Sequence, residues 1–120
     1  MKRLRLSEID NVPVDTATPI PGWTGGEVRR TRQPLLPEGA SKCFNSSVVN
    51  FGKGATTGWH KHQTDQILVI TSGNGIVANE TEELEVAVGD VVQILPDENH
   101  WHGATKDSSM GHITITGVVS

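Results

Sequence analysis

Residues 54–73 read GATTGWHKHQTDQILVITSG, and this stretch decides the fold. It carries two histidines that lie two positions apart, His60 and His62, and a glutamine four positions later, Gln66. Because alternate residues of a β-strand face the same side, we expect the two imidazoles to share one metal ion. Gln66 is expected at the head of the next strand, where its amide oxygen adds a harder donor. The stretch therefore predicts a metal site beside a strand.

A second stretch, residues 89–103, reads GDVVQILPDENHWHG and brings a third imidazole, His100. The five histidines of the chain all follow residue 59. Three imidazoles and an amide oxygen suit Mn, Fe, Ni, Cu or Zn better than Ca or Mg. The alternative is that these histidines are hydrogen-bonded core residues or relics of a lost site. Burying three unpaired imidazoles without an ion is costly, which favours metal binding.

The two stretches resemble the two sequence motifs of the cupin family. In the first motif only Gln66 departs from the pattern, because an acid is usual there. The second motif is matched in spacing over 89–100, with Leu95 where a proline is usual and Asp97 where a glycine is usual. Aspartate tolerates a left-handed turn, so we expect the turn to be kept and His100 to be the fourth ligand. The resemblance implies an all-β fold, a small jelly-roll barrel or double-stranded β-helix.

Within the cupins, Gln66 and the segment HWHGAT at 100–105 resemble the manganese-dependent bacterial hydroxynitrile lyases. The resemblance implies one divalent metal per chain, with Mn expected first and Fe, Ni and Zn as alternatives. It implies four metal ligands, namely His60, His62, Gln66 and His100. It also implies three catalytic or pocket residues, namely His112, His102 and Thr57. Small cupins usually pair, so the resemblance further implies a homodimer.

Short β-rich runs separated by Gly, Asn and Asp predict an all-β meander from about residue 44. These runs are 44–51, 66–71, 75–79, 83–88, 90–95 and 111–119. The segment 11–25 is broken by proline and glycine, so we expect no regular element there and assign it to an irregular arm over about 1–25. A chain of 120 residues is expected to form a single domain over 1–120.

The last run alternates polar and apolar residues, with His112, Thr114 and Thr116 on one face. In a small barrel a polar interior face predicts a pocket, in which His112 takes or gives a proton. The alternative is a surface histidine on an edge strand. His102 shares a face with His100, so it is a fifth donor, a pocket base or a residue that is merely hydrogen-bonded.

Three further residues have structural interpretations. Trp59 and Trp101 each adjoin a ligand histidine but alternate away from it, and we assign both to packing. Cys43 is the only cysteine, which excludes a disulfide within the chain, and a packed thiol is expected.

Composition excludes several classes of partner. The formal net charge is −4, and no basic cluster extends beyond Arg29, Arg30 and Arg32, which argues against a nucleic-acid partner. No run approaches the roughly 20 apolar residues of a membrane helix. The first residues lack the apolar core of a signal peptide, so a cytoplasmic location is expected. A small-molecule substrate is the expected partner.

The expected chemistry follows from charge. Four neutral ligands leave the full charge of a divalent ion in the site, which favours reactions that develop an oxyanion. Cleavage of a cyanohydrin to an aldehyde and cyanide is such a reaction. Two alternatives remain: an Fe(II)-dependent cupin dioxygenase, since a histidine-rich site with open positions also binds dioxygen, and a non-catalytic barrel that binds a small ligand.

Overall fold

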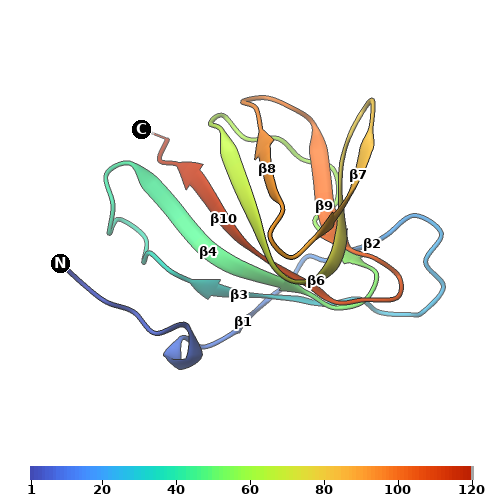
Figure 1. Cartoon of the computed structure of the whole chain (residues 1–120), viewed down its shortest axis with the longest axis horizontal. Coiled ribbons are helices and arrows are strands. Elements are labelled where there is room, and N and C mark those ends of the chain that lie inside the picture. Colours follow the sequence, from blue (N-terminus) through green and yellow to red (C-terminus); the bar gives the residue numbers. More distant parts are fainter. Residues whose placement is uncertain (120) are drawn as a thin grey trace.

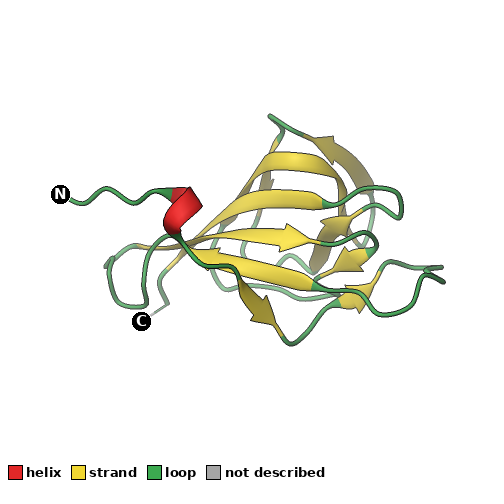
Figure 2. Ribbon diagram, turned by 90° about the horizontal axis from the view of Figure 1, so that it is seen from below, coloured by secondary structure: helices red, strands yellow, loops and turns green. Residues whose placement is uncertain are grey.

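The structure is a computed structural model that describes residues 1–119. It confirms an all-β fold, since one 3-10 turn, η1 (Leu6–Glu8), accompanies ten strands (Figure 2). No helix in these residues is long and apolar enough to cross a membrane. The strands are β1 (Val12–Val14), β2 (Thr18–Pro19), β3 (Arg30–Pro34), β4 (Phe44–Phe51), β5 (Ala55–Thr56), β6 (Gln66–Asn79), β7 (Glu83–Ala87), β8 (Val91–Ile94), β9 (His100–Ala104) and β10 (Met110–Gly117).

All strand pairs are antiparallel, in the order β1-β3-β4-β10-β6-β9-β5-β2, with β7 and β8 also paired to β6. The first half of β6 pairs with β10 and β8, and its second half pairs with β9 and β7. One long strand therefore joins two sheets, and the whole curls into a half-barrel (Figure 1).

The curl has a local cause near the middle of β6. The register of β6 against β10 shifts between Gly111 and His112, as a β-bulge does. Gly73 pairs with Met110 close to this irregularity and has φ 68°, and a Cβ there would collide with the backbone of Ser109. Only glycine fits this combination of left-handed backbone and close approach. The final glycine of the first motif is thus required by the bend.

The predicted strand at 44–51 is confirmed residue for residue. The runs at 66–71 and 75–79 form one strand, because the bend is absorbed without breaking the ladder. The expectation that 11–25 holds no regular element is wrong, since β1 and β2 lie there. Both are very short and pair with distant strands, so local sequence offers little signal for them.

The apolar core occupies one part of the half-barrel. Its buried members are Phe51, Ala55, Leu68, Ile70, Val77, Val86, Ile94, Ala104 and Met110. The inward face of β10 continues from Met110 to His112, Thr114 and Thr116, so this face changes from apolar to polar along one strand. The core therefore ends where a polar cavity begins, and the histidines lie at that boundary.

Candidate metal centre

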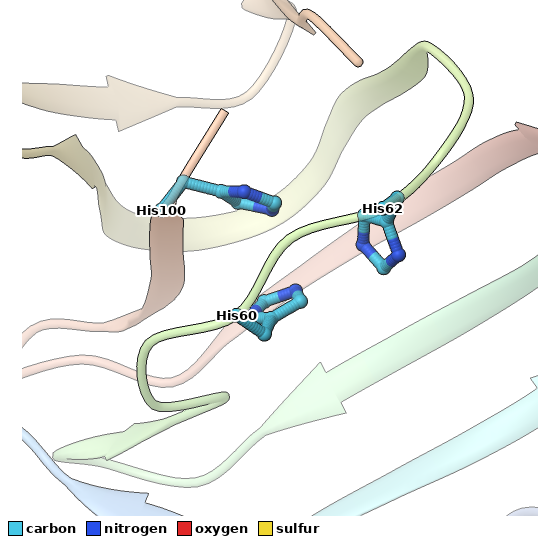
Figure 3. Close-up of side chains that lie close together, drawn as sticks. All are labelled: His60, His62 and His100. Atoms are coloured by element: carbon cyan, nitrogen blue, oxygen red, sulfur yellow. The ribbon is translucent and has the colours of Figure 1, made fainter. Parts of the chain in front are cut away.

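Three imidazoles converge at the boundary of the core. One ring nitrogen each from His60, His62 and His100 lies within 4.8 Å of the others. Figure 3 shows their side chains projecting toward one another from two segments, the β5–β6 connection and the start of β9. The backbones of His60 and His100 form an antiparallel bridge, with two N–H to O=C bonds of 2.9 Å each. These three residues form a group that could hold a metal ion.

The reason for the convergence differs from the prediction. His60 and His62 do not lie on a regular strand, and only His60 makes a β-bridge. Gly58 turns the chain with φ 72°, and the carbonyl of His62 accepts a 2.7 Å hydrogen bond from Asp97 N. The backbone bridge between His60 and His100 and the bond from Asp97 N to the His62 carbonyl therefore orient the rings. Strand alternation was expected to do this.

The ring tautomers of two of these histidines follow from their hydrogen bonds. Nδ1 of His60 lies 2.8 Å from the carbonyl of Gly58, and Nδ1 of His100 lies 2.8 Å from the carbonyl of Glu98. A carbonyl oxygen can only accept, so each Nδ1 carries the proton and each Nε2 keeps a lone pair. Histidines that bind metals are oriented by such bonds. His62 Nε2 is buried with no hydrogen-bond partner in residues 1–119, as an atom awaiting an ion would be.

Gln66 places an amide oxygen beside the three imidazoles. It is buried at the head of β6, as predicted, and its Nε2 donates a 2.7 Å hydrogen bond to Thr114 Oγ1. Its Oε1 is thereby turned to within 3.2 Å of His100 Nε2. Both of these atoms are acceptors, so their lone pairs repel unless a cation lies between them. The donor chemistry therefore fits a divalent metal ion.

Burial keeps the rings of His60 and His100 neutral. Desolvation lowers the pKa of His60 to about 4, and the neighbouring imidazoles contribute in the same direction. Desolvation also lowers the pKa of His100, against the hydrogen bond to the Glu98 carbonyl, which raises it. Neutral imidazole is the form that binds a metal. The site is therefore prepared for an ion near neutral pH.

The turn before His100 is kept although its motif residues differ. Asp97 adopts φ 61°, the left-handed conformation predicted for it. The Glu98 carboxylate accepts hydrogen bonds from Asn79 Nδ2 at 2.8 Å and Leu95 N at 3.0 Å, which lower its pKa. These bonds hold the loop whose Glu98 carbonyl orients His100. The bond from Leu95 uses its backbone N–H, which a proline at this position would lack.

A pair of histidines, His102 and His112, lies beside the candidate metal-binding group of His60, His62 and His100. His112 Nε2 and His102 Nδ1 are 2.9 Å apart, and both side chains are buried against Phe51. The prediction that His112 faces the interior is confirmed. Desolvation lowers the pKa of His112 to about 4 and that of His102 well below its usual value, so both rings are neutral and one donates its N–H to the other. His102 Nε2 has no hydrogen-bond partner in the described chain.

Thr57 joins this pair to the β5–β6 connection. Its backbone N–H donates to the carbonyl of His102 at 2.9 Å, and its Oγ1 accepts from His102 N at 3.2 Å. The His102 ring stacks on the His100 ring, with centroids 5.7 Å apart and planes 9° apart. The shared face predicted for these two histidines is confirmed, and the second pair lies directly beside the metal-binding group.

A cavity of about 740 Å³ opens onto both histidine groups. Side chains of β3, β4 and β10 form much of its wall, together with the β5–β6 connection. The residues predicted for the site that line it are Thr57, His60, His62, Gln66, His102 and His112. The cavity is large enough for a small organic molecule.

Comparison with known families agrees with this geometry. The family described as "Cupin domain" matches residues 47–116, which include both histidine groups. This chain belongs to the cupin family. The cupin is 38% identical over 99 residues to the (R)-mandelonitrile lyase of Granulicella tundricola, an alignment that covers 78% of this chain and 70% of that enzyme.

Solved structures extend the comparison. A cupin-like protein from Thermotoga maritima matches with a TM-score of 0.71 and 30% identity, over 86% of this chain and 80% of that one. A predicted oxalate decarboxylase from the same organism matches with a TM-score of 0.81 and 21% identity, over 98% of this chain and 100% of that one. The second match shows the fold alone.

The burial of Trp101, Trp59 and Cys43 tests the packing role expected for each. Trp101 is buried at 5% exposure, which confirms its assignment to packing, whereas Trp59 is 55% exposed, so its assignment is wrong. The thiol of Cys43 is exposed and not packed, contrary to expectation, because it precedes β4 at the surface. The bond from Gln66 to Thr114 was missed, although the polar face of the last strand was its signal.

Proposed function

We propose that this cupin is a divalent-metal-dependent hydroxynitrile lyase that cleaves cyanohydrins to an aldehyde and hydrogen cyanide. The observation that carries the proposal is the juxtaposition of two histidine groups in one cavity, one with converging ring nitrogens and one a hydrogen-bonded pair of neutral imidazoles. The 38% identity to a mandelonitrile lyase supports the same reaction class.

In this proposal His60, His62, Gln66 and His100 hold the metal. A bound divalent ion supplies Lewis acidity toward a substrate oxygen, undiminished by any anionic ligand. The role of the four side chains is to hold their donor atoms in place, through the carbonyls of Gly58 and Glu98 and the hydroxyl of Thr114. Manganese is the proposed ion, and elemental analysis of the purified protein tests that identity against Fe, Ni and Zn.

His102 and His112 move the proton. A neutral ring nitrogen of the pair accepts the hydroxyl proton of the cyanohydrin. The carbon–carbon bond then breaks, its electron pair leaves on cyanide, and the oxygen becomes the aldehyde carbonyl. The ring returns the proton to cyanide, giving hydrogen cyanide and restoring the neutral pair. Thr57 positions His102 through its two backbone contacts.

The test is cyanide release from mandelonitrile by metal-loaded protein, against the same protein after chelation. We expect release that depends on the metal and that falls at least about a hundredfold in His112→Ala, since positioned proton transfer contributes at least that factor. Metal content and thermal unfolding of the variant are measured in parallel. No release above the metal-free control, or an undiminished rate in His112→Ala, contradicts the proposal.

Oxygen uptake is measured in the same samples. Uptake that depends on iron and on an added substrate, without cyanide release, identifies an oxygenase instead. We also propose that the protein is a homodimer, which light scattering coupled to size exclusion tests by giving about twice the mass of one chain.

A further inference from the structure

Two arginines face the cavity from the strand that precedes β4. Arg30 and Arg32 are two positions apart on β3, so their side chains leave the sheet on the same side, and both line the cavity. In the register of the sheet Arg32 lies opposite Val49, which lies opposite His112. Two strand spacings, about 10 Å, separate the backbones of Arg32 and His112.

Within residues 1–119 these two guanidinium groups have no anionic partner. The ion pairs found in residues 1–119 join Arg5 to Glu8 and Arg29 to Glu27, and neither cavity arginine takes part. The only acidic side chain on the cavity wall is Glu38, which is exposed. The two arginines therefore leave the wall with a net positive charge before any metal is counted.

Some of the N–H donors of Arg30 bind Thr16. Its Nε donates to the carbonyl of Thr16 at 2.6 Å, and its Nη2 donates to Thr16 Oγ1 at 3.1 Å. A guanidinium has five N–H donors, so donors remain for another acceptor. Thr16 holds the group in place, and burial lowers the pKa of Arg30. A half-buried, oriented guanidinium with unused donors is a site for a planar anion.

The electrostatic effect of Arg30 reaches the histidines. Its positive charge is among the smaller causes that lower the pKa values of His60, His102 and His112. Arg30 and these three histidines line one cavity. However, β4 and β10 lie between β3 and β6, which carries Gln66, so three strand spacings, about 14 Å, separate the two walls along the sheet.

We propose that Arg30 and Arg32 bind a carboxylate at the end of the substrate remote from the reacting carbon, so that the cavity takes acidic aldehydes and their cyanohydrins. The reaction assigned to these compounds rests on the proposed lyase function, whereas the binding of the carboxylate does not. The substrate then bridges the cavity, with its hydroxyl at the histidine wall and its carboxylate at β3.

The test measures binding with two unreactive alcohols of the same size, para-(hydroxymethyl)benzoate and para-(hydroxymethyl)benzamide, by calorimetry on metal-loaded protein. We expect the benzoate to bind at least about tenfold more tightly, because a charge-assisted bidentate contact replaces a neutral one. Arg30→Gln and Arg32→Gln each reduce this preference, and the double variant removes it. Arg30→Lys retains part of it, since the charge stays while the fork geometry is lost.

Arg29→Gln is the matched control. It removes the same charge from the adjacent residue, whose side chain is 82% exposed and pairs with Glu27 outside the cavity. This variant keeps the full preference. Because Arg30 also holds Thr16, Arg32→Gln decides the result if Arg30→Gln does not fold. Equal affinity of the unaltered protein for the two alcohols, or an undiminished preference in Arg32→Gln, overturns the proposal. Cyanide release from uncharged mandelonitrile tests the lyase function separately.

Discussion

The two histidine groups of the cavity are made of the same residue type and differ in what holds each Nδ1. In the metal-binding group, Nδ1 of His60 and of His100 donates to a backbone carbonyl, which leaves Nε2 free. In the second pair, His102 Nδ1 bonds the other histidine, His112 Nε2, and no backbone carbonyl takes part in that bond.

This difference suits the two groups to the two roles proposed for them, namely metal binding and proton transfer. A ring anchored to a carbonyl keeps one tautomer and presents a fixed lone pair, as a metal ligand must. In a pair of neutral imidazoles one ring donates its N–H and the other accepts with its lone pair, so one outer ring nitrogen keeps a lone pair that can take up a further proton. Burial lowers the pKa of His60 in the first group and of His112 in the second, so these rings are neutral at neutral pH. Their separate environments, and not their residue type, therefore suit them to different tasks.

The largest expected effect separates the groups by metal content. His100→Ala removes an anchored donor and breaks the convergence of three rings, so bound metal should fall from about one ion per chain to nearly none. His112→Ala removes only the second pair and should retain the metal. Elemental analysis after dialysis checks both variants. Equal retention in the two variants erases the distinction drawn between the groups.

The next effect concerns acid stability of chelated protein. The His112 pKa is about 4 in the folded state against 6.5 for an ordinary histidine. Below pH 6.5 the unfolded chain binds a proton that the folded chain refuses, so the free energy of unfolding is largest above this pH, falls toward pH 4 and then levels off. The contribution of His112 is on the order of 3 kcal/mol. Urea unfolding across this range should show a flatter dependence in His112→Gln, and an unchanged slope contradicts the assignment.

A third comparison lies inside the cavity, between a predicted ligand and its neighbour. Gln66→Ala should weaken metal affinity by roughly a hundredfold, because it removes a donor next to His100. His102→Ala should change metal affinity by less than about threefold while impairing cyanide release. Competition with a coloured chelator measures both affinities. If both variants retain the metal equally, Gln66 is not a ligand.

The smallest expected effect comes from a residue that touches no metal. Thr114→Val keeps the shape of the side chain and removes the hydroxyl that accepts from Gln66 Nε2. The amide is then free to rotate, so metal affinity should fall by roughly tenfold. Thr116→Val, on the same face of β10, is the matched control and should leave metal affinity unchanged. An equal loss in the two variants shows that the bond to Gln66 does not orient the donor.

Much of the fold was predictable, because clear alternation or a continuous apolar run in the sequence predicts a strand. The strand at 44–51 and the start of β6 at Gln66 are examples. The strands β1, β2 and β5 have two or three residues each and form only against distant partners. Sequence patterns report local preference, so elements created by long-range pairing escape them.

The candidate site was predictable as a set of residues but not as a geometry. The spacing of His60, His62, Gln66 and His100 pointed to one ion. The backbone contacts that aim these side chains involve Gly58, Glu98 and Asp97, and their roles depend on loops meeting in space. The sequence showed Arg30 and Arg32 only as part of a small basic cluster, and it did not place them on the wall of the cavity.

The sequence by itself determined the cupin family, the all-β class and the spacing of the histidines that could hold a metal, because motif spacing is a covalent property of the chain. The tertiary structure alone decided which ring nitrogens have no partner within residues 1–119, that His102 and His112 are hydrogen-bonded to each other, and that Arg30 and Arg32 line the same cavity. These properties depend on hydrogen bonds and burial between segments far apart in the chain, and only folding brings such segments together.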